Sequence, residues 1–199
     1  MAISLRPFTL VLLVGLPLAA ASAPGIKNFE QVGSRVFRGA QPTEKGFGYL
    51  AKTGVKTIID LREADDRSTA EGKIVTALGM TYVNVPMTGL TPPSNAEILR
   101  IFAVLEDTNP GSVFVHCKRG ADRTGAVIAA YHIDHDGWDN AKALKDAKRH
   151  DMSGFQIPRQ KFISDFRPLA VSGKVVAAAG ASPAIEVPAI TISEESEPR

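Results

Sequence analysis

The sequence is poor in the features that mark several common protein classes. It has one cysteine in 199 residues, so an internal disulfide bond cannot form. Its 23 basic residues are nearly balanced by 21 acidic ones, which leaves no strong field for binding nucleic acid. Ser68, Ser94 and Ser153 lack the G-x-S-x-G setting of a serine hydrolase. The chain has no internal repeat, and the absence of Walker and dinucleotide-binding glycine patterns argues against those nucleotide-binding enzymes.

The N-terminus has the layout of a secretory signal peptide. Arg6 precedes an almost wholly apolar run, residues 8–21, that ends in small residues. Cleavage after Ala21 fits an A-x-A site, whereas a cut two residues later would place Pro24 next to the cleaved bond, which we disfavour. The run is short for a transmembrane helix, and an uncleaved anchor is the alternative. We expect a signal peptide over residues 1–21, a secreted or periplasmic location, and no stable membrane insertion after cleavage.

The rest of the chain divides into one domain and a tail. An apolar content of 44% is enough for a hydrophobic core, and we expect one domain over residues 22–170. From Val171 the sequence becomes rich in Ala, Val and Pro and then acidic. Because it offers little to bury, the segment 171–199 is predicted to be disordered. The sequence does not define an oligomeric state.

Within the domain, segments typical of strands alternate with segments typical of helices. β-branched and alternating apolar residues predict strands at 35–37, 55–61, 80–87 and 113–116. Capping residues, breakers and helical spacing predict helices at 43–54, 70–78, 94–106, 124–136, 139–150 and 158–166. This order predicts an α/β fold with a mostly parallel central sheet flanked by helices. Trp138, Phe155 and Phe162 are expected to pack in its core.

The most informative stretch is the predicted strand–loop–helix connection around Cys117. Such a connection directs loop amides and the positive end of the helix at one point, which favours an anion. The same positive environment favours a thiolate, the nucleophilic form of cysteine. Arg123, separated from Cys117 by five residues, can bind two oxygens of a phosphoryl group with its planar guanidinium. The alternative, a cysteine buried only for packing, does not account for this arrangement.

The other residues of the loop fit the same chemistry. The predicted phosphate-binding residues are Lys118, Arg119, Gly120, Ala121, Asp122, Arg123 and Thr124. The Thr124 hydroxyl can donate to the thiolate and later to the departing sulfur. Lys118 and Arg119 suit a polyanion such as an inositol phosphate, or they are rim charges without selectivity. No metal or cofactor is expected, because the loop supplies the positive charge.

Residues 116–125 contain the complete pattern His-Cys-x-x-Gly-x-x-Arg-Thr-Gly. In this pattern the chain resembles the cysteine-dependent protein tyrosine phosphatase superfamily. A wider likeness over residues 27–166, which includes Asn28-Phe29, Phe37-Arg38-Gly39 and the segment 54–62, resembles the plant and fungal atypical dual-specificity phosphatases and their bacterial relatives. The resemblance implies a dual-specificity-phosphatase-like fold, with Cys117 as nucleophile, Arg123 as phosphate binder and His116 in support. It also implies that the substrate is a phosphorylated protein, on tyrosine, serine or threonine, or an inositol phosphate.

The general acid departs from the pattern of the superfamily. Most members carry an aspartate on a loop that follows the strand ending here near Met87, but residues 88–95 contain no carboxylate. Asp122, inside the loop, is the first candidate to protonate the leaving oxygen, and it alternatively only braces the loop. Asp65 or Asp66, after another predicted strand, are the other candidates, and the chain alternatively has no acid.

Two further groups of residues and two alternative functions stay open. The polar run from His132 to Asp136 resembles a metal cluster, but polar residues at a helix end account for it better. Arg62 and Arg67 either reach an anionic substrate or pair with the nearby acids Glu63, Asp65 and Asp66. The leading function is an exported cysteine-based phosphatase that works through a phosphocysteine intermediate. The alternatives are a phosphate-binding pseudophosphatase and, more weakly, a sulfur-transfer enzyme of the rhodanese type.

Overall fold

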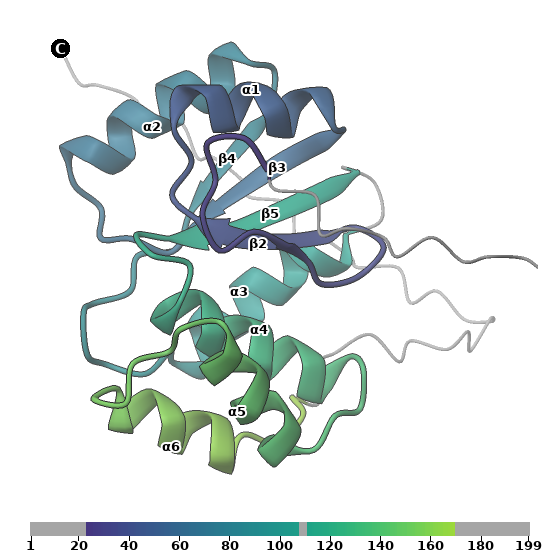
Figure 1. The fold of residues 1–199 in the computed structure, drawn as a ribbon, viewed down its shortest axis with the longest axis vertical. Helices are drawn as coiled ribbons and strands as arrows, with labels where there is room; N and C mark the ends of the chain where they lie inside the picture. The colour runs from purple at the N-terminus through teal and green to yellow at the C-terminus, as the bar shows by residue number, and fades with distance from the viewer. Residues whose placement is uncertain (1–22, 108–110, 170–199) are drawn as a thin grey trace, which may run out of the picture.

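The computed structural model describes residues 23–107 and 111–169, which form a sheet between two layers of helices (Figure 1). The predicted signal peptide at 1–21 and the predicted disordered tail at 171–199 lie outside the described residues, so both stay predictions. Within the two described ranges, none of the helices has the length and apolar character needed to cross a bilayer.

The sheet brings the carboxyl ends of four parallel strands to one edge. Its strands are β1 (Glu30–Gln31), β2 (Val36–Ala40), β3 (Val55–Asp60), β4 (Thr81–Asn84) and β5 (Ser112–Cys117). Their order is β1-β2-β5-β3-β4, and all neighbours are parallel except β1, which is antiparallel to β2. The register pairs Cys117 with Ala40 and His116 with Asp60. In parallel sheets this edge is the usual place for a ligand site.

The helices divide between the two faces of the sheet. They are α1 (Glu44–Lys52), α2 (Asp66–Ala77), α3 (Asn95–Glu106), α4 (Asp122–Asp134), α5 (Asn140–Arg149) and α6 (Ile157–Asp165). Helices α1 and α2 cover one face, and α3 to α6 lie on the other (Figure 1). Alternation along β5 places Val115 and Cys117 in the core under α3 and α4, but Phe114 in the core under α1 and α2. His116 stacks on Phe114, so it lies on the opposite face from its neighbour Cys117.

The α/β architecture and the mostly parallel sheet confirm the sequence-based prediction of fold class. Ser94 and Glu97 form a capping box at the start of α3, as predicted. Helix α2 starts at Asp66 rather than near residue 70, because the Asp65 side chain accepts hydrogen bonds from the first free amides of that helix.

The expectation that three aromatic residues lie in the core is wrong for one of them. Trp138 and Phe162 pack partly buried against the core under α3 and α4. Phe155 is instead 92% exposed. It lies in the short segment before α6, where no helix or strand face directs it inward.

Candidate active site

The candidate site is built where β5 ends and α4 begins. Cys117 closes β5 with a buried side chain, and Asp122 opens α4. Between them Gly120 has a left-handed backbone with φ of 71°, and a Cβ atom there would lie 2.4 Å from the carbonyl carbon of Gly39. Only glycine permits both this conformation and this approach. The loop is therefore seated directly on the end of β2.

Two side chains from distant segments hold the loop from behind. Arg38 Nη2 donates to the carbonyl oxygen of Gly120 at 2.8 Å, and Asn28 Nδ2 donates to the same oxygen at 3.1 Å. A trans peptide directs its N–H opposite to its C=O, so the amide of Ala121 points away from these donors. Holding the carbonyl in this way turns a loop amide toward the side where an anion would bind.

Arg38 is a completely buried arginine in an interior strand. Burial lowers the pKa of its guanidinium to about 10, against the opposing influence of Asp146, Glu30 and the Cys117 thiolate. The group is still charged near neutral pH, so it fixes a positive charge beneath the loop. Sequence reasoning missed this role, although an arginine inside an apolar strand pattern was a signal.

The N-terminus of α4 has no side-chain cap. Ala121 occupies the N-cap position, and no side chain among residues 23–107 and 111–169 accepts a hydrogen bond from the first amides of the helix. These N–H groups and the partial positive charge of the helix end are therefore available to an anion. Thr124 is completely buried in the first turn, and its hydroxyl has no hydrogen-bond partner within the described part of the chain. Buried hydroxyls normally have one. The described residues show no hydrogen bond from Thr124 to the Cys117 sulfur, so that donation stays a prediction.

Main-chain oxygens hold the guanidinium of Arg123 at the carboxyl edge of the sheet. Its Nη1 donates to the carbonyl of Leu61, just after β3, at 3.3 Å, and to that of Met87, after β4, at 3.2 Å. These acceptors fix the side chain without neutralising it. The other N–H donors can make the bidentate contact with a phosphoryl group that the sequence predicts.

A second buried arginine, Arg159 of α6, holds the segment that follows Met87. Its Nη2 donates to the carbonyl of Thr88 at 2.6 Å, and its Nη1 donates to that of Gly89 at 2.5 Å. Burial and then the nearby charge of Arg123 lower the pKa of Arg159. The two arginines are thus neighbours, and Arg159 supports the segment that carries one of the acceptors of Arg123. No sequence pattern pointed to it.

The contacts of Asp122 favour the bracing alternative. Its Oδ1 accepts the backbone N–H of Ser153 at 2.9 Å, and its Oδ2 accepts a hydrogen bond from Arg119. Both oxygens are therefore engaged as hydrogen-bond acceptors that tie the loop to Ser153 and Arg119. The contact also places the charge of Arg119 against a carboxylate rather than leaving it at the rim. The role of Asp122 as general acid stays a prediction.

The two other predicted acids lie at the start of α2. Asp65 accepts the backbone N–H groups of Arg67 and Ser68 and forms an ion pair of 2.8 Å with Arg67. The bond from Ser68 and the Arg67 side chain hold the pKa of Asp65 below its usual value. Asp66 is the first residue of the helix proper. Asp65 is thus committed to capping and to Arg67, and the predicted pairing of Arg67 with a nearby acid is confirmed.

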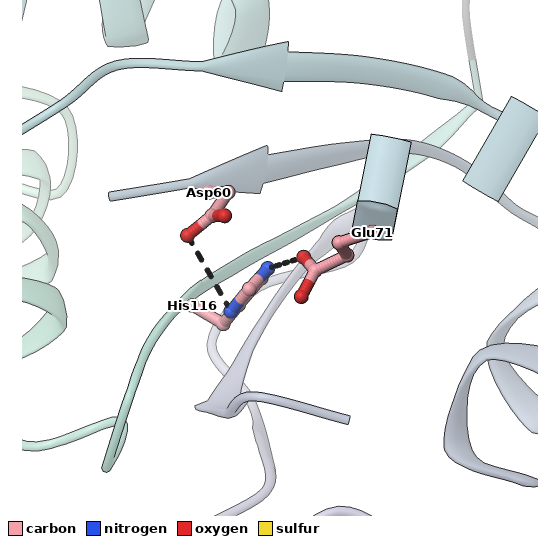
Figure 2. A group of neighbouring side chains, drawn as sticks. All are labelled: Asp60, Glu71 and His116. Carbon is pink, nitrogen blue, oxygen red and sulfur yellow. Dashed lines mark ion pairs between the residues drawn. The ribbon is translucent and has the colours of Figure 1, made fainter. Parts of the chain in front are cut away.

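His116 lies in a fully buried cluster of charged side chains on the other face of the sheet (Figure 2). Its Nε2 is 2.8 Å from Glu71 Oε1, and its Nδ1 is 3.9 Å from Asp60 Oδ1. Arg62 bridges the two carboxylates, at 2.6 Å from Asp60 Oδ2 and 2.7 Å from Glu71 Oε2. Burial raises the pKa of Asp60, but the bonds from Arg62 and the charge of His116 outweigh it and hold that pKa below its usual value.

This cluster corrects one expectation about Arg62 and adds a residue that sequence reasoning missed. Arg62 is buried and pairs with Asp60 and Glu71 rather than with Glu63, Asp65 or Asp66, and it is not placed to meet a substrate. Glu71 comes from α2, 45 positions before His116, so no local pattern joins them.

A cavity lies at the opposite edge of the sheet. It measures about 1100 Å³ and is lined by the start of β2, the end of α3 and the end of α4. There Asp136 binds two histidines, at 2.6 Å from His132 Nδ1 and 2.9 Å from His135 Nδ1. His132 also stacks on Trp138, with ring centroids 3.8 Å apart. These residues close a helix end, as the sequence indicated.

A protein-family model and two kinds of known protein are similar to this chain. A family model described as "DSP-PTPase phosphatase fused to NAD+ Kinase" matches residues 14–165. The dual specificity protein phosphatase TpbA of Pseudomonas aeruginosa (strain UCBPP-PA14) is 31% identical over 134 residues, which cover 66% of this chain and 57% of TpbA. Inositol diphosphatase DSP5 of Arabidopsis thaliana is 26% identical over 145 residues, 70% of this chain and 69% of DSP5.

The fold is similar to the core catalytic domain of the PP-IP phosphatase SIW14 from S. cerevisiae, solved with citrate. The TM-score is 0.64 at 18% identity, over 71% of this chain and 86% of that domain. This likeness concerns the fold. The chain spans little more than half the length of TpbA, the relative with which it shares 31% of aligned residues.

Proposed function

Because the chain belongs to the DSP-PTPase family of cysteine-dependent phosphatases, we propose that it hydrolyses phosphate monoesters with Cys117 as nucleophile. One observation carries the proposal. Cys117 and Arg123 border a single loop at the carboxyl edge of the sheet, where α4 has no side-chain cap and main-chain oxygens alone hold Arg123. That loop offers a phosphate dianion amides, a helix N-terminus and a guanidinium.

Hydrolysis proceeds in two displacements at phosphorus. The Cys117 thiolate attacks, an S–P bond forms, the ester P–O bond breaks, and the departing alkoxide or phenoxide takes a proton from a general acid or from solvent water. Water then attacks the phosphocysteine, the S–P bond breaks, and phosphate leaves as the thiolate returns. Arg123 and the loop amides stabilise the equatorial oxygens in both steps, and the Thr124 hydroxyl donates to the departing sulfur.

The proton supply shapes the choice of ester. Both oxygens of Asp122 are engaged as acceptors, and the segment 88–95 contains no carboxylate. General acid help matters most when the leaving group is poor. An enzyme with weak acid help acts best on esters whose leaving group departs readily, such as those of a phenol, which favours phosphotyrosine over phosphoserine and phosphothreonine.

A phosphorylated protein is favoured over an inositol phosphate by the surface near the site. Arg119, one of the two cations that suited a polyanion, is paired with Asp122. Leu90, Phe155 and Ile157 are exposed by 66%, 92% and 63%. Their segments adjoin, since Arg159 and Gln156 donate to the carbonyl before Leu90. Apolar side chains suit a polypeptide better than an inositol ring carrying several phosphates.

The test is a panel of phosphopeptides and inositol polyphosphates assayed with the protein and with Cys117→Ser as blank. Higher kcat/KM for tyrosine phosphopeptides supports the favoured class. A preference for inositol polyphosphates overturns it while keeping the phosphatase, in line with the name of DSP5. Phosphate binding without turnover of any ester indicates a pseudophosphatase.

We also propose that the enzyme acts outside the cytoplasm, after removal of about 21 residues, from the layout of its N-terminus. Intact-mass spectrometry of the protein from its native host tests this proposal. A mass that includes residues 1–21 on a cytoplasmic protein overturns it.

A further inference from the structure

We propose that Glu71 is a positioning residue that keeps His116 doubly protonated behind the nucleophile, so that α2 sets the reactivity of Cys117. This inference rests on the proposed use of Cys117 as a nucleophile and extends it to a residue on the opposite face of the sheet. It is argued from the contacts of the imidazole ring, then from the charges around it (Figure 2).

Each nitrogen of the His116 ring meets an acceptor. Nε2 lies 2.8 Å from a carboxylate oxygen of Glu71, and Nδ1 lies 3.4 Å from the backbone carbonyl of Cys117 and 3.9 Å from Asp60. A neutral imidazole has one N–H, so it would turn a lone pair toward one of these oxygens. The imidazolium has a hydrogen on both nitrogens and turns no lone pair toward either oxygen. The Glu71 contact is close but not aligned as a linear hydrogen bond, so charge supplies much of its attraction.

The charges around the ring also favour the doubly protonated form of His116. Five side chains contact the His116 ring or its partners. They are the carboxylates of Asp60 on β3 and Glu71 on α2, the guanidinium of Arg62, the phenol of Tyr82 on β4 and the amide of Gln41. Burial and then the hydrogen bond to Asp60 raise the pKa of Tyr82, so the phenol stays neutral. Two carboxylates and one guanidinium leave a buried negative charge, which the imidazolium cancels. An uncompensated buried charge is costly.

The same three side chains have the donor types of a metal site, since one ligand atom from each lies within 4.8 Å of the others. Two features favour the ion network. Glu71 and Asp60 approach opposite nitrogens of the ring, so one ion could not join all three through a single ring nitrogen. The guanidinium of Arg62 also already bridges both carboxylates.

The position of His116 beside the nucleophile has a consequence for catalysis. The imidazolium belongs to the residue next to Cys117, and its Nδ1 is directed at the carbonyl of Cys117. A fixed positive charge on the residue next to the nucleophile favours the thiolate. Replacing Glu71 with glutamine keeps the shape but removes the negative charge that holds the proton on His116.

The experiment follows His116 and Cys117 separately. ¹⁵N NMR of histidine-labelled protein, with His116→Gln to assign the resonance, reports whether both ring nitrogens carry hydrogen at pH 7. Alkylation of Cys117 by iodoacetamide between pH 5 and 9 reports the thiolate. Neither readout requires turnover, so a failure of the proposed phosphatase activity is seen separately in the aryl phosphate assay.

We expect a doubly protonated His116 in the wild type and loss of that state in Glu71→Gln. At pH 6 the alkylation rate should fall about tenfold, the change that corresponds to one unit in the titration of a thiol. Glu71→Asp should recover much of the rate because it keeps the charge. Glu44→Gln, an exposed matched change on α1, should leave the alkylation profile unchanged.

Two results overturn the inference. One is a His116 with hydrogen on a single nitrogen in the wild type at pH 7, which needs no variant and so is independent of folding. The other is a folded Glu71→Gln protein whose alkylation profile matches that of the wild type. A lower unfolding temperature with an unmoved profile would indicate a structural role alone.

Discussion

The two edges of the parallel sheet differ in how their polar groups are used. At the amino edge, a cavity of about 1100 Å³ adjoins Asp136, which binds two histidines at the end of α4. At the carboxyl edge, the loop after Cys117 lies against β2, and buried side chains hold its carbonyls from behind. The amino edge has a sizeable cavity, whereas the carboxyl edge has the guanidinium of Arg123, held by main-chain oxygens, and the helix N-terminus without a side-chain cap. Organised charge at the carboxyl edge is the reason for placing the proposed active site there.

The largest effect at the carboxyl edge is expected when the nucleophile itself is changed. Cys117→Ser should abolish turnover, because an alcohol in place of the thiolate is a far weaker nucleophile at neutral pH. Phosphate or vanadate should still bind, measured by isothermal titration calorimetry, since the backbone and Arg123 supply the contacts. Turnover above the level of a buffer blank would rule out the phosphocysteine route.

Arg123→Lys should lower kcat/KM by about 100-fold or more, the usual scale for losing an oriented donor to a developing negative charge. An ammonium cannot reproduce the planar fork or reach both main-chain oxygens that hold the guanidinium. Steady-state kinetics on an aryl phosphate give the value. Near-normal kinetics would remove Arg123 from the site.

Asp122→Asn should reduce kcat by a similar factor on an aryl and an alkyl phosphate. The brace to Ser153 and Arg119 is disturbed for every substrate, whereas loss of a general acid costs about 10²–10⁴-fold and most with a poor leaving group. A series of leaving groups measures the difference. A loss confined to alkyl phosphates would instead assign the acid to Asp122.

At the amino edge, Asp136→Asn should leave activity unchanged and reduce stability by less than about 1 kcal/mol, as expected for a partly exposed pair. Burial raises the pKa of Asp136, but the bonds from His135 and His132 outweigh it and hold that pKa below its usual value. The stabilisation is therefore present above the unfolded-state pKa and is lost as the pH falls through the folded-state value.

Urea unfolding of both proteins should show the difference at pH 7 and lose it in strong acid. An altered kcat in Asp136→Asn would contradict the separation of the two edges.

What could be predicted from the sequence was local. Strand, loop and helix around Cys117 are contiguous, so the spacing to Arg123 sufficed to place both at one loop. The capping box of α3 lies within four residues and was equally accessible. The fold class followed from the alternation of such segments.

What escaped prediction depends on contacts between distant segments. Arg38 and Asn28 meet Gly120 across 82 and 92 positions, and no spacing rule connects them. The partners of His116 and the support given by Arg159 arise in the same way. Phe155 was wrongly assigned to the core because its hydrophobicity does not reveal the path of the segment before α6. That segment directs the Phe155 side chain outward.

The acceptors that hold Arg123 have a consequence for how this sequence can change. Both are peptide oxygens, so they are set by the path of the chain after β3 and β4 and survive any side chain that preserves that path. Residues 61 and 87 can therefore be replaced by other apolar residues without a compensating change at Arg123. In a library of variants, the anchoring of Arg123 should be robust to substitution, while the exposed residues around Phe155 can be exchanged freely.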